Sequence, residues 1–260
     1  MKFSIITVCF NAGDKLRDTT ENVLRQTYKD FEIIVKDGGS TDNSTDKLPA
    51  DDRIKLISEK DKGIYDAMNH AVAYASGDYV IFMNCGDSFY DEFVLEKAAK
   101  VIDDNPGRRI YYGDAYFCLA NEIISQPSQI TESICYRHVP NHQSCIFDRI
   151  LWDDDGFDLT YRIRADYDFF LRNYFDRGIR PAYLGITVAS YEGGGYSESR
   201  ENRKRDKDEH RAIVVKYMGE KKANHYRRMM ILTLQPLRTK LAHSKAFSGV
   251  YNGIKKKLIK

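Results

Sequence analysis

The sequence predicts an α/β fold in which a mostly parallel central sheet is flanked by helices, as in Rossmann-like proteins. Strand-like and helix-like segments alternate through the first hundred residues, and this alternation favours a parallel sheet. Two apolar segments, 31–36 and 79–83, run into polar turns that carry Asp37 and Asp87. Open α/β sheets bind ligands beyond the carboxyl ends of their strands. The two acids therefore indicate a site for a nucleotide and a metal ion at one edge of the sheet.

Each expected element rests on its own pattern. Residues 3–10 are mostly apolar, as in a strand that is buried on both faces. Residues 14–26 carry Leu16, Val23 and Leu24 at helical spacing. By the same criteria we expect, in order, a strand over 31–36, a short helix from Asp42 or Ser44, a strand over 54–57, a helix over 65–75, a strand over 79–83 and a helix over 89–103.

The second half of the chain is less regular. Asn105, Pro106 and Gly107 break the chain. Further strands are expected over 109–119 and 181–191, and an aromatic helix over 166–177. From residue 200 the composition becomes charged and helical, which places a boundary near residue 205.

Composition is ordinary for a globular protein, and 260 residues allow a substantial core. No run approaches the ~18 apolar residues of a membrane span. The five cysteines are odd in number and form no Cys-x-x-Cys pair, which argues against a disulfide framework and a zinc site. We therefore expect reduced thiols in a cytoplasmic protein.

Charge is distributed unevenly. Residues 216–260 contain twelve Lys or Arg residues and a single acid, Glu220, for a net charge of +11. Because the whole chain carries +2, the remainder carries about −9. An acidic body with a basic tail calls for an acidic partner for the tail.

Five segments within residues 1–90 match the motifs of a known family in order and spacing: Ile5–Asn11, Leu24–Tyr28, Asp37–Asp42, Glu59–Asn69 and Gly77–Asp87. Shorter matches follow at 141–143, 165–168 and 191–195. With these motifs the chain resembles family 2 glycosyltransferases of the bacterial polysaccharide type, which have the nucleotide-sugar-binding GT-A fold. One such match is weak, whereas five in the correct order are specific.

The resemblance implies an inverting glycosyltransferase that moves a sugar from a nucleotide-diphosphate donor, a UDP-sugar, to a hydroxyl of a saccharide acceptor. It further implies a lipid-linked acceptor, surface polysaccharide synthesis at the inner face of the cell membrane, and Mn²⁺ or Mg²⁺ as cofactor. On this basis residues 1–205 form the catalytic domain, with a nucleotide-sugar half of about 1–105 and an acceptor half of about 106–205. Residues 206–260 form a basic helical extension.

Asp87 is the expected metal ligand, because hard cations prefer carboxylate oxygen. Asn84 and Gly86 stand where the family often has acids, so Asp87 is the one carboxylate left in this motif. The alternative is that Asp87 caps a helix starting near Ser88. Asn84 would contact the ribose or the donor sugar, or serve as a turn residue.

Asp37 is the candidate for recognition of the nucleotide base, since a carboxylate accepts a hydrogen bond from a base N–H. Alternatively, it caps the turn that begins at Gly38. Thr7, Phe10 and Asn11 would form the other wall of this nucleotide pocket. Phe10 would stack on the base or fill core space.

Asp166 is the preferred general base and Asp168 the second choice, in a motif that matches the acidic motif of the family. Both lie near a helix N-terminus, where the helix dipole favours the ionised form. The alternative is two ordinary N-terminal acids. His142 would reach the metal, the diphosphate or the acceptor, or be a plain polar residue.

Another group of residues is expected to shape the donor-sugar and phosphate site, the alternatives being helix caps and a plain loop. Gly193 to Gly195 resemble a mobile lid that is followed by phosphate-pairing cations. The residues assigned to the donor sugar and phosphate are Asp61, Lys62, Asp66, Asn69, Arg200 and Arg203.

The basic tail 216–260 is consistent with peripheral contact with an anionic membrane or with packing on the body. Nucleic acid is not an expected partner, because no recognition motif accompanies the charge. Two other functions stay open: a non-catalytic nucleotide-sugar-binding module, and a nucleotidyltransferase-like enzyme. The second should carry a basic glycine-rich loop after the first strand, and residues 8–16 lack one.

Overall fold

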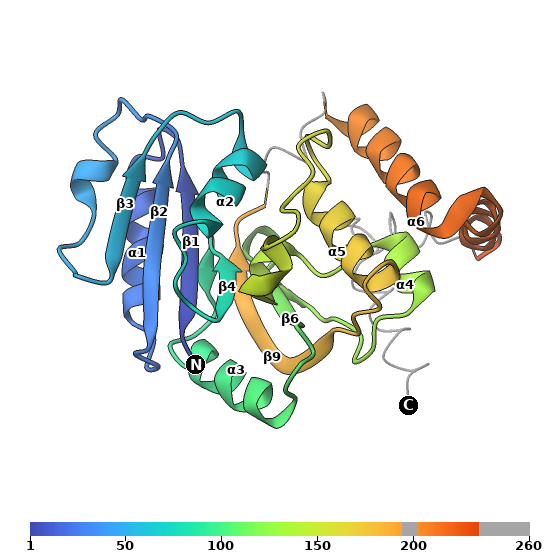
Figure 1. Ribbon diagram of the computed structural model, residues 1–260, viewed down its shortest axis with the longest axis horizontal. Coiled ribbons are helices and arrows are strands. Elements are labelled where there is room, and N and C mark those ends of the chain that lie inside the picture. Colours follow the sequence, from blue (N-terminus) through green and yellow to red (C-terminus); the bar gives the residue numbers. More distant parts are fainter. Residues whose placement is uncertain (194–201, 234–260) are drawn as a thin grey trace. The chain divides into compact units, whose positions relative to one another are not determined.

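The computed structural model describes residues 1–193 and 202–233 (Figure 1). Its first part alternates strands and helices as predicted: β1 (Phe3–Cys9), α1 (Lys15–Leu24), β2 (Phe31–Asp37), β3 (Ile54–Ser58), α2 (Ile64–Val72) and β4 (Tyr79–Phe82). These four strands are parallel neighbours in the order β3-β2-β1-β4. A 3-10 turn at Thr45–Lys47 takes the place of the short helix expected from Asp42 or Ser44.

The register brings the carboxyl ends of these strands to one edge of the sheet. Cys9 pairs with Asp37, and Asp37 pairs with Ser58. On the other side of β1, Ile6 lies opposite Phe82, the last residue of β4. The turns that carry Asp37 and Asp87 therefore leave the sheet at the same edge, as the sequence predicts.

The second part of the chain completes a mixed sheet. It adds β5 (Ser88–Phe89), α3 (Val94–Asp104), β6 (Ile110–Phe117), β7 (Glu122–Ile124), α4 (Glu132–Arg137), β8 (Cys145–Asp148), α5 (Ala165–Phe175) and β9 (Ala182–Tyr191). The described residues form nine strands in the order β3-β2-β1-β4-β8-β6-β9-β5, with β7 beside β6. Strand β8 is antiparallel to β4 and β6, whereas β6 and β9 are parallel. The predicted α/β fold class is confirmed.

Some elements differ from the prediction. The helix expected over 89–103 begins only at Val94, because Ser88 and Phe89 pair with β9 instead. Strands β7 and β8 and helix α4 were not predicted. They contain three, four and six residues, too few for a clear periodic signal. Strand β8 nevertheless matters for the site, because it directly follows the segment that carries His142.

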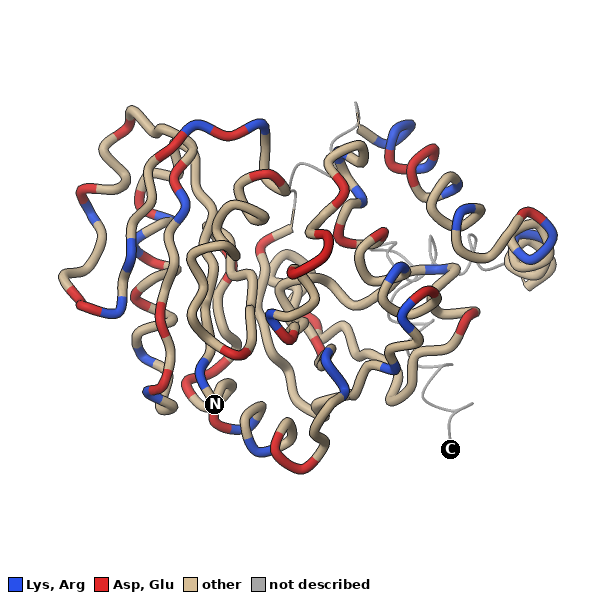
Figure 2. Tube along the Cα trace, in the orientation of Figure 1, with Lys and Arg blue, Asp and Glu red and all other residues tan. Residues whose placement is uncertain are grey.

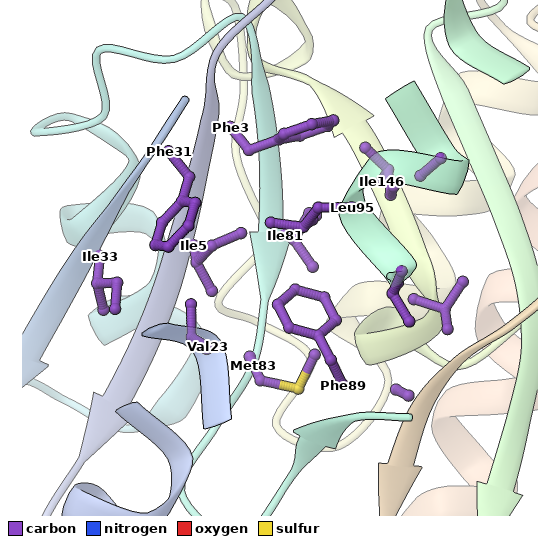
Figure 3. Close-up of a cluster of buried hydrophobic side chains, with 14 of the residues drawn as sticks. Phe3, Ile5, Val23, Phe31, Ile33, Ile81, Met83, Phe89, Leu95 and Ile146 are labelled. Carbon is purple, nitrogen blue, oxygen red and sulfur yellow. The ribbon is translucent and has the colours of Figure 1, made fainter. Parts of the chain in front are cut away.

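The main hydrophobic core lies on one face of the sheet (Figure 3). Alternate residues of a strand point to the same face, so Phe3 and Ile5 of β1 both enter this core. Helices α1 and α3 cover it with residues such as Val23 and Leu95. Helix α2 packs on β1 and β2 from the opposite face (Figure 1). Strands β1 and β2 are thus buried on both faces, which explains their mostly apolar sequences.

Helix α6 (Arg203–Leu232) is the last described element, and Gly219 interrupts its helical geometry with a φ of 74°. The chain divides into two compact units between Ile213 and Val214, so the first turns of α6 belong to the same unit as the sheet. The boundary expected near residue 205 falls close to the start of this helix. None of the helices in 1–193 and 202–233 has the length and apolar character needed to span a membrane.

Candidate active site

A cavity of about 470 Å³ opens beyond the carboxyl end of β4. Segments that are distant in the sequence line it: the turn after β4, the 3-10 turn before β8, the start of α5 and the end of β9. Its lining includes Lys15, Asn84, Asp87, His142, Asp166 and Glu192. The fold therefore brings together the residues that the sequence proposes as metal ligand, general base and histidine.

His142 lies between Asn84 and Asp166. The amide Nδ2 of Asn84 is 3.2 Å from Nε2 of His142, and Oδ2 of Asp166 is 3.3 Å from Nδ1. Nδ1–H donates to the Asp166 carboxylate, and the Asn84 amide contacts Nε2 on the other side of the ring. The histidine ring is therefore held on both sides.

The Asp166 carboxylate is surrounded by donors. Its Oδ1 accepts hydrogen bonds from the Tyr65 hydroxyl at 3.0 Å and from the Tyr167 N–H at 2.8 Å. Burial alone would raise the pKa of Asp166, but the hydrogen bond and charge of His142 and the hydrogen bond from Tyr65 outweigh it, so this pKa is lowered. Burial alone would lower the pKa of His142, but the Asp166 carboxylate outweighs it and raises that pKa. An ionised carboxylate beside a readily protonated histidine can accept a proton from a hydroxyl group.

Helix α1 holds the turn that carries Asp87. The Thr19 hydroxyl donates to the carbonyl oxygen of Asp87 at 2.9 Å and accepts from the N–H of Gly86 at 3.1 Å. Gly86 has a φ of 97°, a conformation that favours glycine. Because Ser88 starts a strand, Asp87 does not cap a helix there.

The surroundings of Asp87 fit a cation. Burial raises the pKa of Asp87 to about 6, Glu192 adds to this effect, and His142 and Lys15 oppose it. A nearby cation would favour the ionised form of such a carboxyl group. The described residues contain no group of three His, Cys, Asp or Glu side chains arranged to hold a metal. A metal here would therefore take few protein ligands and complete its shell with water and phosphate oxygens, as Mg²⁺ commonly does.

Lys15, at the start of α1, adds a positive charge to the first cavity. Its Nζ lies 2.5 Å from Oε2 of Glu192, which follows β9. The hydrogen bond from Glu192 and its charge raise the pKa of Lys15. A Cβ at Gly86 would lie 3.6 Å from this Nζ. The ion pair therefore holds the Lys15 ammonium group next to the turn that carries Asp87.

A second cavity, of about 620 Å³, shares Ile64, Tyr65 and Arg162 with the first. Phe10 lines it and is 65% exposed, so the Phe10 ring does not fill core space. Lys62 and Asp66, two of the predicted donor-sugar residues, also line this cavity.

Asp37 is buried and holds its own turn. Its carboxylate accepts from the Ser40 N–H at 3.0 Å, from the Ser40 hydroxyl at 2.5 Å and from the Ser58 hydroxyl. Burial alone would raise the pKa of Asp37, but these hydrogen bonds outweigh it and lower the pKa. Asp37 lines neither cavity. Its carboxylate caps the turn that begins at Gly38, which is the alternative role that the sequence allows.

The other predicted nucleotide residues lie around the same turn. The Asn11 N–H donates to Ser40, and its side-chain oxygen accepts from the N–H of Thr41. A Cβ at Gly38 would lie 2.7 Å from Oδ2 of Asp61 and 3.4 Å from the Phe10 ring, so this glycine permits their close approach. Thr7 is buried, and within the described part of the chain its hydroxyl has no hydrogen-bond partner.

Some predicted donor-sugar residues have clear local roles. Asp66 accepts from the N–H of Lys62 at 2.8 Å, as a residue in the first turn of α2 can. Asp61 accepts from the N–H of Gly63 at 2.9 Å. The Asn69 amide bonds both the N–H and the C=O of Phe157, at 2.8 and 2.9 Å, and so ties α2 to a distant loop.

The remaining predicted residues lie away from the cavities or outside the structure. Asp168 has no exposed surface, whereas Asp166 lines the first cavity, which favours Asp166 as the residue that contacts substrate. Arg203 is exposed at the start of α6 and lines neither cavity. Arg200, Gly194 and Gly195 lie outside the described residues.

Sequence reasoning missed Lys15, Arg162 and Glu192 as cavity residues. Lys15 looks like an ordinary surface residue of an amphipathic helix. Glu192 lies within the matched segment 191–195, and this is the one signal that could have identified it.

Comparison with known proteins reveals clear relatives. Residues 4–146 match the model of Glycosyl transferase family 2. A PGL/p-HBAD biosynthesis glycosyltransferase of Mycobacterium bovis is 31% identical over 204 residues, or 76% of this chain and 79% of the relative. The UDP-Glc:alpha-D-GlcNAc-diphosphoundecaprenol beta-1,3-glucosyltransferase WfgD of Escherichia coli is 27% identical, over 72% of this chain and 76% of the relative.

Solved structures show the same fold. TarS of S. aureus superposes with a TM-score of 0.63 and 18% identity over 95% of this chain, which corresponds to 44% of the TarS chain. The match covers 74% of TarS 1–349, which was crystallised with UDP-GlcNAc. The mannosyltransferase PcManGT of Pyrobaculum calidifontis, solved with GDP-Man and Mn²⁺, has a TM-score of 0.63 and 16% identity, with coverage of 96% and 83% of the two chains.

Proposed function

This chain belongs to glycosyl transferase family 2, and we propose that it is an inverting enzyme that transfers a sugar from a UDP-sugar to a hydroxyl of a saccharide acceptor. The observation that carries this proposal is the meeting of Asp87, His142 and Asp166 around one cavity. These residues come from three separate segments, and together they offer a cation-binding carboxylate and a base.

The donor would extend across both cavities. The nucleoside would lie in the second cavity, where the exposed ring of Phe10 offers a stacking surface and Lys62 and Asp66 line the wall. Asp37, Gly38, Asn11 and Thr7 would form and stabilise the loops behind Phe10. The diphosphate would lie where the cavities join, within reach of Arg162 and Lys15. Guanidinium and ammonium groups bind phosphate oxygens through charge-assisted hydrogen bonds.

Asp87 would hold Mn²⁺ or Mg²⁺ together with the donor phosphates. A bound cation neutralises the negative charge that develops on the diphosphate leaving group. The raised pKa of Asp87 supports this role, because a carboxylate that is destabilised by burial gains from a bound cation. PcManGT, which shares the fold, was solved with Mn²⁺.

Asp166 would accept the proton of the acceptor hydroxyl as that oxygen attacks the anomeric carbon. His142 and Tyr65 hold the carboxylate by its two oxygens, and this orientation is what a general base requires. One base and a direct displacement invert the configuration of the anomeric carbon. Asn84 would position His142 and contact the donor from the same turn as Asp87.

The acceptor is proposed to be a lipid-linked saccharide for a surface polysaccharide or glycolipid, used at the cytoplasmic face of the membrane. The name of the E. coli relative specifies an acceptor linked to diphosphoundecaprenol. The basic residues of 216–260 would attach the enzyme peripherally to anionic lipid, each contributing ~1 kcal/mol near the surface. In the first turns of α6 basic residues alternate with acidic ones (Figure 2), so the attachment would depend on the region beyond them.

The test is a transfer assay with Mn²⁺, a panel of UDP-sugars and a diphospholipid-linked GlcNAc acceptor. Mass spectrometry would detect the added sugar, and NMR would assign its anomeric configuration. An inverting enzyme should convert a sugar that is α-linked to UDP into a β-linked product. Binding of UDP without transfer or donor hydrolysis would instead indicate a nucleotide-sugar-binding module, and an α-linked product would contradict inversion.

A further inference from the structure

A single carboxylate of α6 caps the loop that leads to Asp166. Glu209 Oε1 accepts from the N–H of Arg162 at 3.0 Å, and its Oε2 accepts from the N–H groups of Ile163 and Arg164 at 2.9 and 3.0 Å. Helix α5 begins at the next residue, and its N-cap residue Arg164 makes no side-chain cap hydrogen bond. Successive backbone N–H groups bind anions. Glu209 therefore binds, from another helix, the three N–H groups that immediately precede α5.

Neighbouring contacts fasten the same two segments together. The Arg164 guanidinium forms a two-pronged ion pair with Asp206, with Nε 2.8 Å from Oδ1 and Nη2 3.0 Å from Oδ2. His210 stacks on Tyr167 with ring centroids 5.3 Å apart. The first turns of α6 thus contact the loop before Asp166 and the residue after it.

The capped loop also touches the candidate base. The hydroxyl of Tyr65 lies 2.7 Å from the carbonyl oxygen of Ile163 and 3.0 Å from Oδ1 of Asp166. Arg162, whose N–H binds Glu209, lines both cavities. A displacement of residues 162–164 would therefore move the Tyr65 hydroxyl away from Asp166. It would also change the region shared by the two cavities, where the diphosphate is expected.

We propose that Glu209 is a positioning residue for sugar transfer: by capping residues 162–164 it holds Tyr65 and Asp166 in their reactive arrangement. This inference rests on the proposed function, because it takes Asp166 as the base. It gives the start of the C-terminal helix a catalytic task that is separate from any role of the basic tail.

The informative change is Glu209→Gln in the full-length protein. Glutamine keeps the shape of the side chain but replaces one acceptor oxygen with an NH₂ group, which cannot accept a backbone N–H. Whichever way the amide is oriented, at least one of the three N–H groups loses its acceptor. The matched control is Glu220→Gln, the same chemical change at an exposed position of the same helix.

Hydrogen exchange should be faster for the amides of residues 162–164 in Glu209→Gln than in the control. The kcat should fall by ~10- to 100-fold, consistent with the ~10²-fold that a 1 Å misplacement can cost, while the KM for donor changes little. The acidic limb of the kcat–pH profile should move to higher pH, because Asp166 loses part of the hydrogen bonding that lowers its pKa. A purely structural role would lower the melting temperature and leave kcat and this limb unchanged.

Asp206→Asn supplies a second comparison, since it weakens the Arg164 pair without removing an acceptor from the three N–H groups. It should lower the melting temperature but change kcat little. Unchanged exchange at 162–164 or an unchanged kcat in Glu209→Gln would overturn the inference. A wild-type protein that transfers no sugar would instead overturn the proposed function, so the two failures are distinguishable.

Discussion

Nδ1 of His142 lies 3.3 Å from Oδ2 of Asp166, and this contact joins two segments on either side of β8. The pair shifts both pKa values in opposite directions, raising that of the histidine and lowering that of the carboxyl. Tyr65 contacts the Asp166 carboxylate and Asn84 contacts the His142 ring, so the orientation of the pair is fixed from both ends. Preorganisation of this kind contributes to catalysis by keeping reacting groups in line.

His142→Gln should destabilise the protein in a pH-dependent way. The folded-state pKa of His142 lies above its ordinary value of 6.5, so the stability from its protonation is present below 6.5 and lost as pH rises through the folded value. Thermal denaturation should therefore show a larger drop in melting temperature at about pH 6 than at about pH 9. An equal drop at both pH values would argue against the ion pair.

Asp87→Asn should stabilise the metal-free protein at neutral pH while weakening metal-dependent donor binding. The folded pKa is about 6 against an ordinary 3.8, so wild type loses stability as pH rises from 3.8 through 6. Removing the charge should raise the free energy of unfolding by up to ~3 kcal/mol above about pH 6 and leave it unchanged below about pH 3.8. Denaturation curves at both ends of the range and calorimetry of UDP with and without Mn²⁺ would check both effects. Unchanged Mn²⁺-dependent UDP affinity would refute the metal role.

Lys15→Met should weaken binding of UDP more than binding of uridine, because in the proposed binding mode the missing charge would face the diphosphate and not the base. Stability should change little, since the side chains of the Lys15–Glu192 pair are 55% and 58% exposed and such pairs contribute ~0–1 kcal/mol. Glu192→Gln is the matched variant, and it should retain or strengthen UDP binding by releasing the lysine. Equal loss of affinity for UDP and uridine would show that Lys15 acts through the fold.

The tail can be tested by sedimentation with anionic liposomes. Residues 234–260 contain seven Lys or Arg residues and no acid, so their attraction to anionic lipid should weaken as salt rises. The full chain should co-sediment at low salt and be partly released at high salt, whereas a chain ending at residue 233 should bind less. Equal sedimentation of the two would exclude residues 234–260 as an anchor.

The sequence predicted the parallel half of the sheet well because its strands are mostly apolar runs that end at polar turns. It also identified Asn84, Asp87, His142 and Asp166, which all line the first cavity. These four lie in motifs of recognisable type, and their meeting follows from a topology that the family resemblance implied.

Other features had no local signal. Strand β8 has four residues, and its antiparallel place between β4 and β6 depends on distant partners. Lys15 and Glu192 are 177 positions apart, so neither residue alone reveals the pair. Asp37 resembles a ligand-binding acid in sequence, yet hydrogen bonds from Ser40 and Ser58 occupy its carboxylate.

The central claim is that Asp166 accepts the proton of the acceptor hydroxyl, and its most direct test is the rate of sugar transfer by Asp166→Asn at saturating donor. The proposed mechanism predicts a loss of ~10²–10⁴-fold in kcat, with UDP affinity retained and with near-normal activity in Asp176→Asn, an exposed change at the end of the same helix. Near wild-type turnover by Asp166→Asn would contradict the claim, and the base would then have to be sought elsewhere, with Asp168 tested next.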